Sequence, residues 1–133
     1  MAEELVGKKI LLVDDDADIL TAIQAALADT GATIETAGDG DQAIEKISSI
    51  MPDLVVLDMM LPKRSGFLVM ERLKRGRKGG GPGPRVIMIT GNQGTRHRVY
   101  AETLGVNLYL NKPFRMERLV ASIKELLEAA PQP

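Results

Sequence analysis

The sequence predicts an α/β protein built on a five-stranded parallel sheet. Short apolar runs alternate with longer stretches of helical period along the chain, and residues 54–57 are apolar at every position, as a strand buried on both faces requires. The 133 residues, of which 44% are hydrophobic, suffice for one ordinary domain with a sizeable core. Alternating strands and helices form right-handed βαβ units, with helices on both faces of the sheet.

Five strands are expected, over residues 10–13, 33–37, 54–57, 85–90 and 108–110. The first, third and fourth are the clearest, because their apolar runs are uninterrupted. The second alternates only weakly between polar and apolar residues, and the fifth is a shorter, weaker run. These two are predicted mainly by their place in the alternation of strands and helices.

Five helices are expected, over residues 19–27, 43–51, 65–75, 95–104 and 119–127. The first should stop at Gly31, because glycine commonly ends a helix in the left-handed conformation, and Pro52 should end the second. The fourth has few apolar positions and is followed by Gly105. Glycine and proline dominate residues 76–84, which predicts a flexible surface loop.

Composition excludes several functional classes. Seventeen basic residues against eighteen acidic ones leave a net charge of −1, so no bulk field favours nucleic acid or an anionic membrane. No cysteine and a single histidine, His97, exclude a disulfide framework, a thiolate zinc site and an iron–sulfur cluster. The N-terminus lacks a signal-peptide pattern, and no apolar run approaches the roughly eighteen residues of a membrane span. We expect a cytoplasmic protein without membrane or direct nucleic-acid contacts.

Polar side chains stand where the predicted strands end. In chain order they are Asp14, Asp15, Asp16, Asp58, Thr90 and Lys112. The carboxyl ends of parallel strands meet at one edge, where ligands bind at the point of reversed strand order, so these side chains should lie close together. Two unit charges about 4 Å apart repel by on the order of 4 kcal/mol at an effective dielectric constant near 20. Several clustered carboxylates therefore need a cation or shifted pKa values.

The chemistry of this set favours phosphoryl transfer. Oxygen ligands without histidine or cysteine suit a hard cation, and Mg²⁺ typically takes one or two carboxylates together with water and phosphate oxygens. Lys112 offers a point charge to a phosphoryl oxygen, and Thr90 can donate a hydrogen bond to another. A carboxylate nucleophile, a magnesium ion, an ammonium group and a hydroxyl donor together fit that reaction.

Each of these residues has a simpler explanation when it is taken alone. The acidic run at 14–16 can cap the following helix, and Asp58 can begin a turn. Thr90 can be an ordinary β-branched strand residue, and Lys112 a solvated charge. The joint occurrence at successive strand ends favours a site, because capping explains only one member of the set.

The sequence resembles the receiver domains of two-component response regulators from about residue 8 to residue 127. Residues 10–16, 53–62, 86–90 and 111–114 carry the resemblance in that order, with Gly66 eight residues after Asp58. The resemblance implies a flavodoxin-like, doubly wound (βα)5 fold with strand order 2-1-3-4-5. It also implies that residues 1–133 form a single receiver domain, in which residues 129–133 are a tail.

The same resemblance implies a role for each site residue. Asp58 would be the phosphoacceptor and would attack a phosphohistidine of a sensor histidine kinase or phosphotransfer protein. Asp15 would bind Mg²⁺ directly and Asp14 mostly through water, while the Asp58 carboxylate and the backbone carbonyl of Met60 would complete the protein ligands. Lys112 would pair with the phosphoryl group.

Three further residues complete the implied site. Thr90 would move to bond a phosphoryl oxygen, and Tyr109 occupies the position of the family's switching aromatic, although a half-buried strand tyrosine is an equal alternative. The peptide before Pro113 is expected to be cis. Gly91 and Ser65 depart from the usual Ala and Asp of the family, but neither change removes a chemical group from the site.

The implied protein is a signalling phosphoacceptor and not an enzyme, since it would assist only its own phosphorylation and dephosphorylation. Phosphorylation would bias a surface formed by the fourth helix, fifth strand and fifth helix, because the poorly anchored fourth helix directly follows Thr90. A downstream protein partner or a missing output domain would then respond to that surface.

Two alternatives stay open at this point. Asp14 and Asp16 match the Asp-x-Asp spacing of haloacid dehalogenase-type phosphatases, although Asp18 stands where those enzymes prefer Thr or Val and the chain is short for that fold. The second alternative is a receiver-shaped binding module that works without phosphate. The presence of all the chemical groups of the site argues against it, namely those of Asp15, Asp58, Thr90 and Lys112.

Overall fold

The computed structural model describes residues 4–61, 63, 65–75, 83–91 and 95–128. The Gly/Pro loop predicted at 76–84 lies outside these residues except for its last two positions, and the tail at 129–133 lies outside them entirely.

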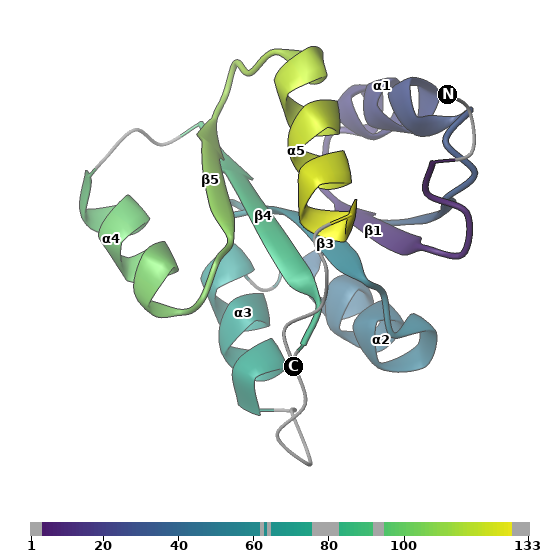
Figure 1. Cartoon of the computed structure of the whole chain (residues 1–133). Helices are drawn as coiled ribbons and strands as arrows, with labels where there is room; N and C mark the ends of the chain where they lie inside the picture. The colour runs from purple at the N-terminus through teal and green to yellow at the C-terminus, as the bar shows by residue number, and fades with distance from the viewer. Residues whose placement is uncertain (1–3, 62, 64, 76–82, 92–94, 129–133) are drawn as a thin grey trace.

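Five parallel strands form one sheet in the order β2-β1-β3-β4-β5, which confirms the predicted topology (Figure 1). The strands are β1 (Lys9–Val13), β2 (Thr33–Ala37), β3 (Leu54–Asp58), β4 (Arg85–Thr90) and β5 (Leu108–Asn111). The register pairs Val13 with Leu57 and Asp58 with Ile89, so the carboxyl ends of the three central strands lie at one edge. The strand order reverses between β1 and β3, where ligands bind in folds of this type.

Five helices cover the two faces of the sheet: α1 and α5 lie on one face, and α2, α3 and α4 on the other (Figure 1). The helices are α1 (Ala17–Leu27), α2 (Gly40–Ile50), α3 (Gly66–Arg75), α4 (Thr95–Thr103) and α5 (Met116–Glu128). In the described part of the chain, none of the helices has both the length and the apolar character of a membrane span.

Successive residues of a strand contribute to two separate apolar cores. In β1, Ile10 and Leu12 pack toward α1 and α5, whereas Leu11 and Val13 pack toward α2 and α3. Helices on both faces exclude water from the interior of the sheet, and β3 is buried throughout. This burial explains why its sequence is a continuous apolar run instead of an alternating one.

The predicted spans 19–27 and 65–75 agree with α1 and α3 to within two residues, but Gly31 does not end α1 and Ser65 lies just before α3. Helix α1 ends at Leu27, before Gly31, because both the backbone N–H and the hydroxyl of Thr30 donate to the Leu27 carbonyl and close the last turn. Gly31 does adopt a left-handed backbone, with φ of +85°, but in the loop that follows. Helix α3 begins at Gly66, and the Ser65 hydroxyl accepts a hydrogen bond from an N–H in its first turn.

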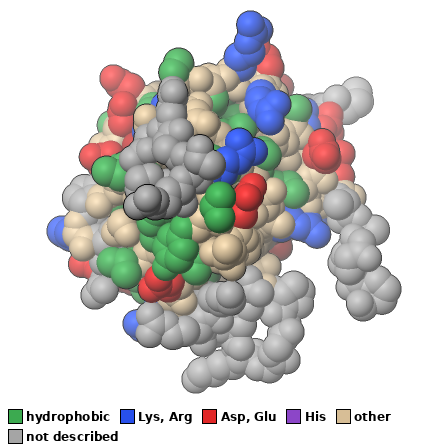
Figure 2. Space-filling view, turned by 90° about the vertical axis from the view of Figure 1, so that its left-hand side faces the viewer, with side chains coloured by type: hydrophobic (Ala, Val, Ile, Leu, Met, Phe, Trp, Pro, Cys, Tyr) green, Lys and Arg blue, Asp and Glu red, His purple; other side chains and the backbone are tan. Residues whose placement is uncertain are grey.

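Large hydrophobic side chains also occur on the surface. Among the described residues, those exposed are Val6, Met51, Met60, Leu68, Val99 and Tyr100. Figure 2 views the molecule from the side of α4 and shows hydrophobic side chains gathered between acidic and basic ones. Helix α4 thus presents apolar groups to solvent as well as to the core.

Candidate functional site

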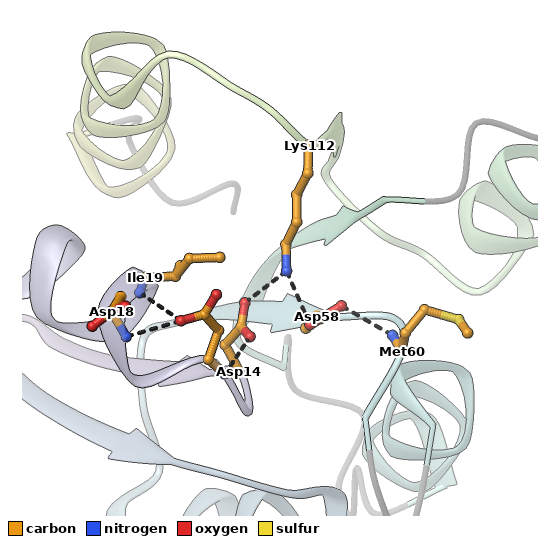
Figure 3. A network of polar contacts seen from close by, with 7 residues as sticks. Asp14, Asp18, Ile19, Asp58, Met60 and Lys112 are labelled. Atoms are coloured by element: carbon orange, nitrogen blue, oxygen red, sulfur yellow. Dashed lines mark hydrogen bonds and ion pairs between the residues drawn. The ribbon is translucent and has the colours of Figure 1, made fainter.

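The three aspartates that follow β1 have different surroundings. Asp14 is buried, and one of its carboxylate oxygens accepts a hydrogen bond from the backbone N–H of Asp16 at 2.9 Å. Asp15 is exposed at the same edge of the sheet. Asp16 is the N-cap of α1, and its carboxylate accepts from the N–H groups of Asp18 at 2.9 Å and Ile19 at 3.4 Å (Figure 3). The capping explanation is therefore correct for Asp16 and wrong for Asp14.

Asp58 is the last residue of β3, and its side chain is only 4% exposed. Its Oδ1 accepts the backbone N–H of Met60 at 3.0 Å, which fixes the orientation of the carboxylate. Burial raises the pKa of Asp58 above its ordinary value, and the nearby charge of Asp14 adds to this rise. The Met60 N–H and the Lys112 ammonium oppose the rise in pKa without cancelling it.

Lys112 joins the two buried carboxylates. Its Nζ lies 3.1 Å from Oδ2 of Asp14 and 3.2 Å from Oδ2 of Asp58, between the ends of β1 and β3 (Figure 3). Burial alone would lower the pKa of Lys112, but the two carboxylates outweigh it and raise the pKa, so the side chain is an ammonium at neutral pH. The backbone N–H of Lys112 donates to the Thr90 carbonyl at 2.7 Å, and the peptide between Lys112 and Pro113 is cis.

The carboxylates of Asp14, Asp15 and Asp58 form a cluster able to hold a metal ion. One oxygen from each lies within 4.8 Å of the other two. The donor set consists of oxygen atoms only, which suits a hard divalent cation such as Mg²⁺. One ammonium beside three carboxylates leaves the cluster short of positive charge, and a bound cation would supply it.

Thr90 and Tyr109, on the neighbouring strands β4 and β5, are both buried. Thr90 is fully buried at the end of β4, one residue beyond the pairing partner of Asp58. Tyr109 is 7% exposed and packs in the core on the α4 side, so it is more buried than the half-buried strand tyrosine considered from the sequence. Its hydroxyl is buried without a hydrogen-bond partner among the described residues, and burial raises its pKa. Nothing in the sequence pattern signalled this unpaired hydroxyl.

Gly66 allows α3 to begin directly against the backbone of the Asp58 strand. A Cβ atom at this position would lie 2.6 Å from the Asp58 carbonyl oxygen and 2.7 Å from the Cα of Met59. The Gly66 N–H donates to the Met59 carbonyl at 2.8 Å. Gly66 is thus a positioning residue for the end of β3, a role that its spacing from Asp58 did not reveal.

The fold and the site together define a doubly wound α/β domain with an acidic cluster, in which one lysine joins two buried carboxylates, at the reversal of strand order. The family model of the response regulator receiver domain matches residues 10–124, and the chain belongs to that family. This result excludes the haloacid dehalogenase-type phosphatase. That enzyme would pair the Asp14 and Asp16 carboxylates, but in the structure Asp14 contacts Lys112 and Asp16 caps α1.

Curated proteins of similar sequence agree with the assignment to the receiver family. The chain is 43% identical over 116 residues to the transcriptional regulatory protein DltR of Streptococcus agalactiae, a match that covers 87% of this chain and 50% of that protein. It is 37% identical over 122 residues to the alkaline phosphatase synthesis transcriptional regulatory protein PhoP of Bacillus subtilis, with 92% and 49% covered. The chain thus spans about half the length of the curated relatives it matches.

Solved structures show the same architecture. A CheY-like response regulator receiver domain protein from Methanospirillum hungatei is 30% identical, with a TM-score of 0.81 over 91% of this chain and 94% of that one. The signal receiver domain of a Luxo repressor protein from Vibrio parahaemolyticus is 26% identical, with a TM-score of 0.84 over 91% and 90%. The flavodoxin-like fold predicted from the sequence is confirmed.

Proposed function

We propose that this receiver domain accepts a phosphoryl group on Asp58 from a sensor histidine kinase or a phosphotransfer protein. The observation that carries the proposal is the placement of the Lys112 ammonium between the Asp14 and Asp58 carboxylates. This contact joins strand ends that lie 98 and 54 residues from Lys112 in the sequence. An ammonium group at this position neutralises the nucleophile and lies ready to pair with the charge of an incoming phosphoryl group.

In the transfer step, an oxygen of the Asp58 carboxylate attacks the phosphorus atom of a phosphohistidine. The new oxygen–phosphorus bond forms as the nitrogen–phosphorus bond breaks, and the imidazole leaves as a neutral ring after taking up one proton from solvent. The Met60 N–H holds the other carboxylate oxygen, which favours attack by one defined oxygen atom. After transfer, the Lys112 ammonium pairs with a phosphoryl oxygen. The Thr90 hydroxyl donates a hydrogen bond to a second phosphoryl oxygen.

The cation in this proposal is Mg²⁺, held by the carboxylates of Asp14, Asp15 and Asp58 together with the backbone carbonyl of Met60. The three clustered carboxylates support this assignment, because their oxygen atoms match the preference of a hard ion. When bound, Mg²⁺ neutralises charge that develops on the phosphoryl oxygens. Asp16 is not a ligand in this proposal, because its carboxylate caps α1.

Phosphorylation then shifts a surface formed by α4, β5 and α5. Tyr109 of β5 supports this part of the proposal, because its ring is buried beside α4 while its hydroxyl has no partner among the described residues. A buried unpaired hydroxyl raises the free energy of this conformation and leaves the side chain ready to reorganise. A movement of Thr90 toward the phosphoryl group then changes how the interior packs around Tyr109.

The response is read by another protein or by an output domain, since the relatives of this chain include transcriptional regulators about twice its length. We propose that the domain is a phosphoacceptor and no enzyme toward other substrates. A cytoplasmic location is part of the proposal, and the absence of cysteine from the chain is consistent with a reducing compartment.

Intact-mass measurement after incubation with acetyl phosphate and Mg²⁺ tests this function. The native chain should gain one phosphoryl group, and Asp58→Asn should gain none. Asp16→Asn is the matched control, because it makes the same change on a carboxylate that caps α1, and asparagine also caps helices. Equal phosphorylation of the native chain and Asp58→Asn would overturn the proposal, because another residue would then be the acceptor. No mass gain in either chain would also overturn it and would favour a module that works without phosphate.

A further inference from the structure

Tyr100 of helix α4 contacts helix α3 in two ways. The Tyr100 hydroxyl donates to Oε2 of Glu71 at 2.6 Å. The Tyr100 ring also meets the Phe67 ring edge-on, with the ring centroids 4.9 Å apart and an interplanar angle of 71°. Both partners lie on α3, so a single residue of α4 makes a polar and an aromatic contact with the neighbouring helix.

Few of the α4 side chains that the structure describes are buried in the core. Of its side chains at 98–103, which the structure describes, only Ala101 is buried, and an alanine contributes little apolar area. Arg98 and Glu102 form an ion pair 3.6 Å long, but both belong to α4, so their contact does not join the helix to the rest of the protein. The contacts of Tyr100 are therefore a substantial part of what holds α4 in this position.

Helix α3 is fixed with respect to the site. Its first residue, Gly66, packs on the backbone of Asp58 so closely that a Cβ atom would overlap the carbonyl oxygen. Val69 and Met70 of the same helix are buried in the core. A displacement of α4 consequently takes place relative to α3, and it must break or rearrange the hydrogen bond from Tyr100 to Glu71.

We propose that Tyr100 and Glu71 form a latch that holds α4 in the unphosphorylated position and so lowers the population of the active conformation. This inference rests on the proposed function, because the helix that the latch restrains belongs to the surface that phosphorylation shifts. A latch of this kind reduces the rate of phosphorylation as well, since a reactant selective for the active conformation reacts only with the fraction of molecules in that conformation.

The acceptor is a carboxylate, which gives the hydrogen bond its strength. A hydroxyl donating to a charged oxygen at 2.6 Å is a charge-assisted contact, stronger than one between neutral groups. Solvent reaches the pair, because Tyr100 is 42% exposed, and this access moderates the contribution. The latch therefore restrains the helix without locking it.

The test compares three variants of the whole chain. Tyr100→Phe removes the hydroxyl but keeps the ring that contacts Phe67, and Glu71→Gln removes the charge of the acceptor but keeps an oxygen. Glu102→Gln is the control, because it makes the same carboxylate-to-amide change on the solvent side of α4. Two quantities are measured: amide hydrogen exchange of residues 98–104 without phosphorylation, and the rate of mass gain with acetyl phosphate and Mg²⁺.

Tyr100→Phe should speed both exchange in α4 and phosphorylation by about threefold to tenfold, the range expected from the loss of one net hydrogen bond. Glu71→Gln should act in the same direction, and the double variant should show less than the sum of the two single effects, because both changes weaken the hydrogen bond between Tyr100 and Glu71. Glu102→Gln should match the native chain in both measurements.

Native rates of exchange and phosphorylation in Tyr100→Phe would overturn the latch. Faster exchange with an unchanged phosphorylation rate would also overturn it, because Tyr100 would then only stabilise the helix locally. A native chain that gains no phosphoryl group would contradict the proposed function itself, an outcome that the native sample alone reveals.

Discussion

The Nζ atom of Lys112 lies 3.2 Å from Oδ2 of Asp58, although 54 residues separate the two in the sequence. The contact exists because β5 and β3 end at the same edge of a parallel sheet, with β4 between them. The same ammonium reaches Asp14 beyond the end of β1. The contacts of Lys112 therefore depend on the alignment of several strands. Its removal should affect both the stability of the fold and the binding of a cation.

Lys112→Met should destabilise the metal-free chain by about 1–2 kcal/mol, because it leaves two buried carboxylates without their shared cation. The loss is smaller than for a fully buried pair, since 26% of the lysine side chain is exposed. Mg²⁺ should recover part of the loss, because a bound cation stabilises the folded state and replaces the missing charge.

Urea unfolding with and without Mg²⁺ measures this effect. Lys124→Met is the control, because Lys124 pairs with Glu4 at 3.2 Å on α5, away from the cluster. If Lys112→Met were as stable as the native chain without metal, the ion pairs of Lys112 would contribute nothing to the fold.

Asp58→Asn should stabilise the protein at neutral pH. The pKa of Asp58 is raised in the folded state, so burying its charge opposes folding once the pH passes the pKa of about 3.9 in the unfolded chain. The penalty is absent at lower pH, where both states are protonated, and is complete above the folded-state pKa. The gain in unfolding free energy should therefore grow as the pH rises through this window.

Denaturation midpoints across this pH range, without metal, provide the measurement. A gain from Asp58→Asn that is independent of pH would show that its origin is packing and not ionisation.

Gly66→Ala should destabilise the fold by about 1–3 kcal/mol, because the new methyl group meets backbone atoms that cannot move aside easily. It should also slow phosphorylation, since the atoms in its way belong to Asp58 and Met59. Gly38→Ala is the matched control: its Cβ would meet only a side-chain oxygen of Gln42, at an ordinary 3.9 Å. Equal midpoints in urea for the two variants would contradict the close approach of α3 to β3.

Tyr109→Phe should raise the unfolding free energy of the unphosphorylated chain by about 1 kcal/mol, because it removes a buried hydroxyl that has no partner among the described residues. Tyr100→Phe should have the opposite sign, since its hydroxyl is bonded to Glu71. The two variants share one chemical change, so urea unfolding compares them directly. Loss of stability in Tyr109→Phe would mean that its hydroxyl does have a partner.

The sequence pattern was sufficient to predict the parallel sheet and the edge of the sheet at which the polar residues meet. Continuous apolar runs predicted β3 and β4. Because the carboxyl ends of parallel strands lie at one edge of a sheet, the sequence also predicted Asp58 and Lys112 at the same edge. Burial on both faces makes such strands easy to recognise, because few other structures need so many consecutive apolar residues.

Details that depend on local geometry could not be predicted from the sequence pattern. Three consecutive aspartates look alike in a sequence, and only the path of the backbone after β1 places Asp14 beside Lys112 and Asp16 at the start of α1. Helix α1 ended before Gly31 because the Thr30 hydroxyl closes its last turn, a contact that hydrophobic periodicity does not encode. The contact of Tyr100 with α3 also depends on tertiary placement, in a helix whose own pattern is mostly polar.

The central claim is that Asp58 becomes an acyl phosphate, and trapping that group tests it most directly. The chain is treated with acetyl phosphate and Mg²⁺ and then with borohydride, which reduces an aspartyl phosphate to homoserine, and peptide mass spectrometry locates the change. We predict homoserine at position 58 alone, and none when Mg²⁺ is removed by a chelator. Homoserine at position 14 or 15, or a native chain in which position 58 remains aspartate, would contradict the claim.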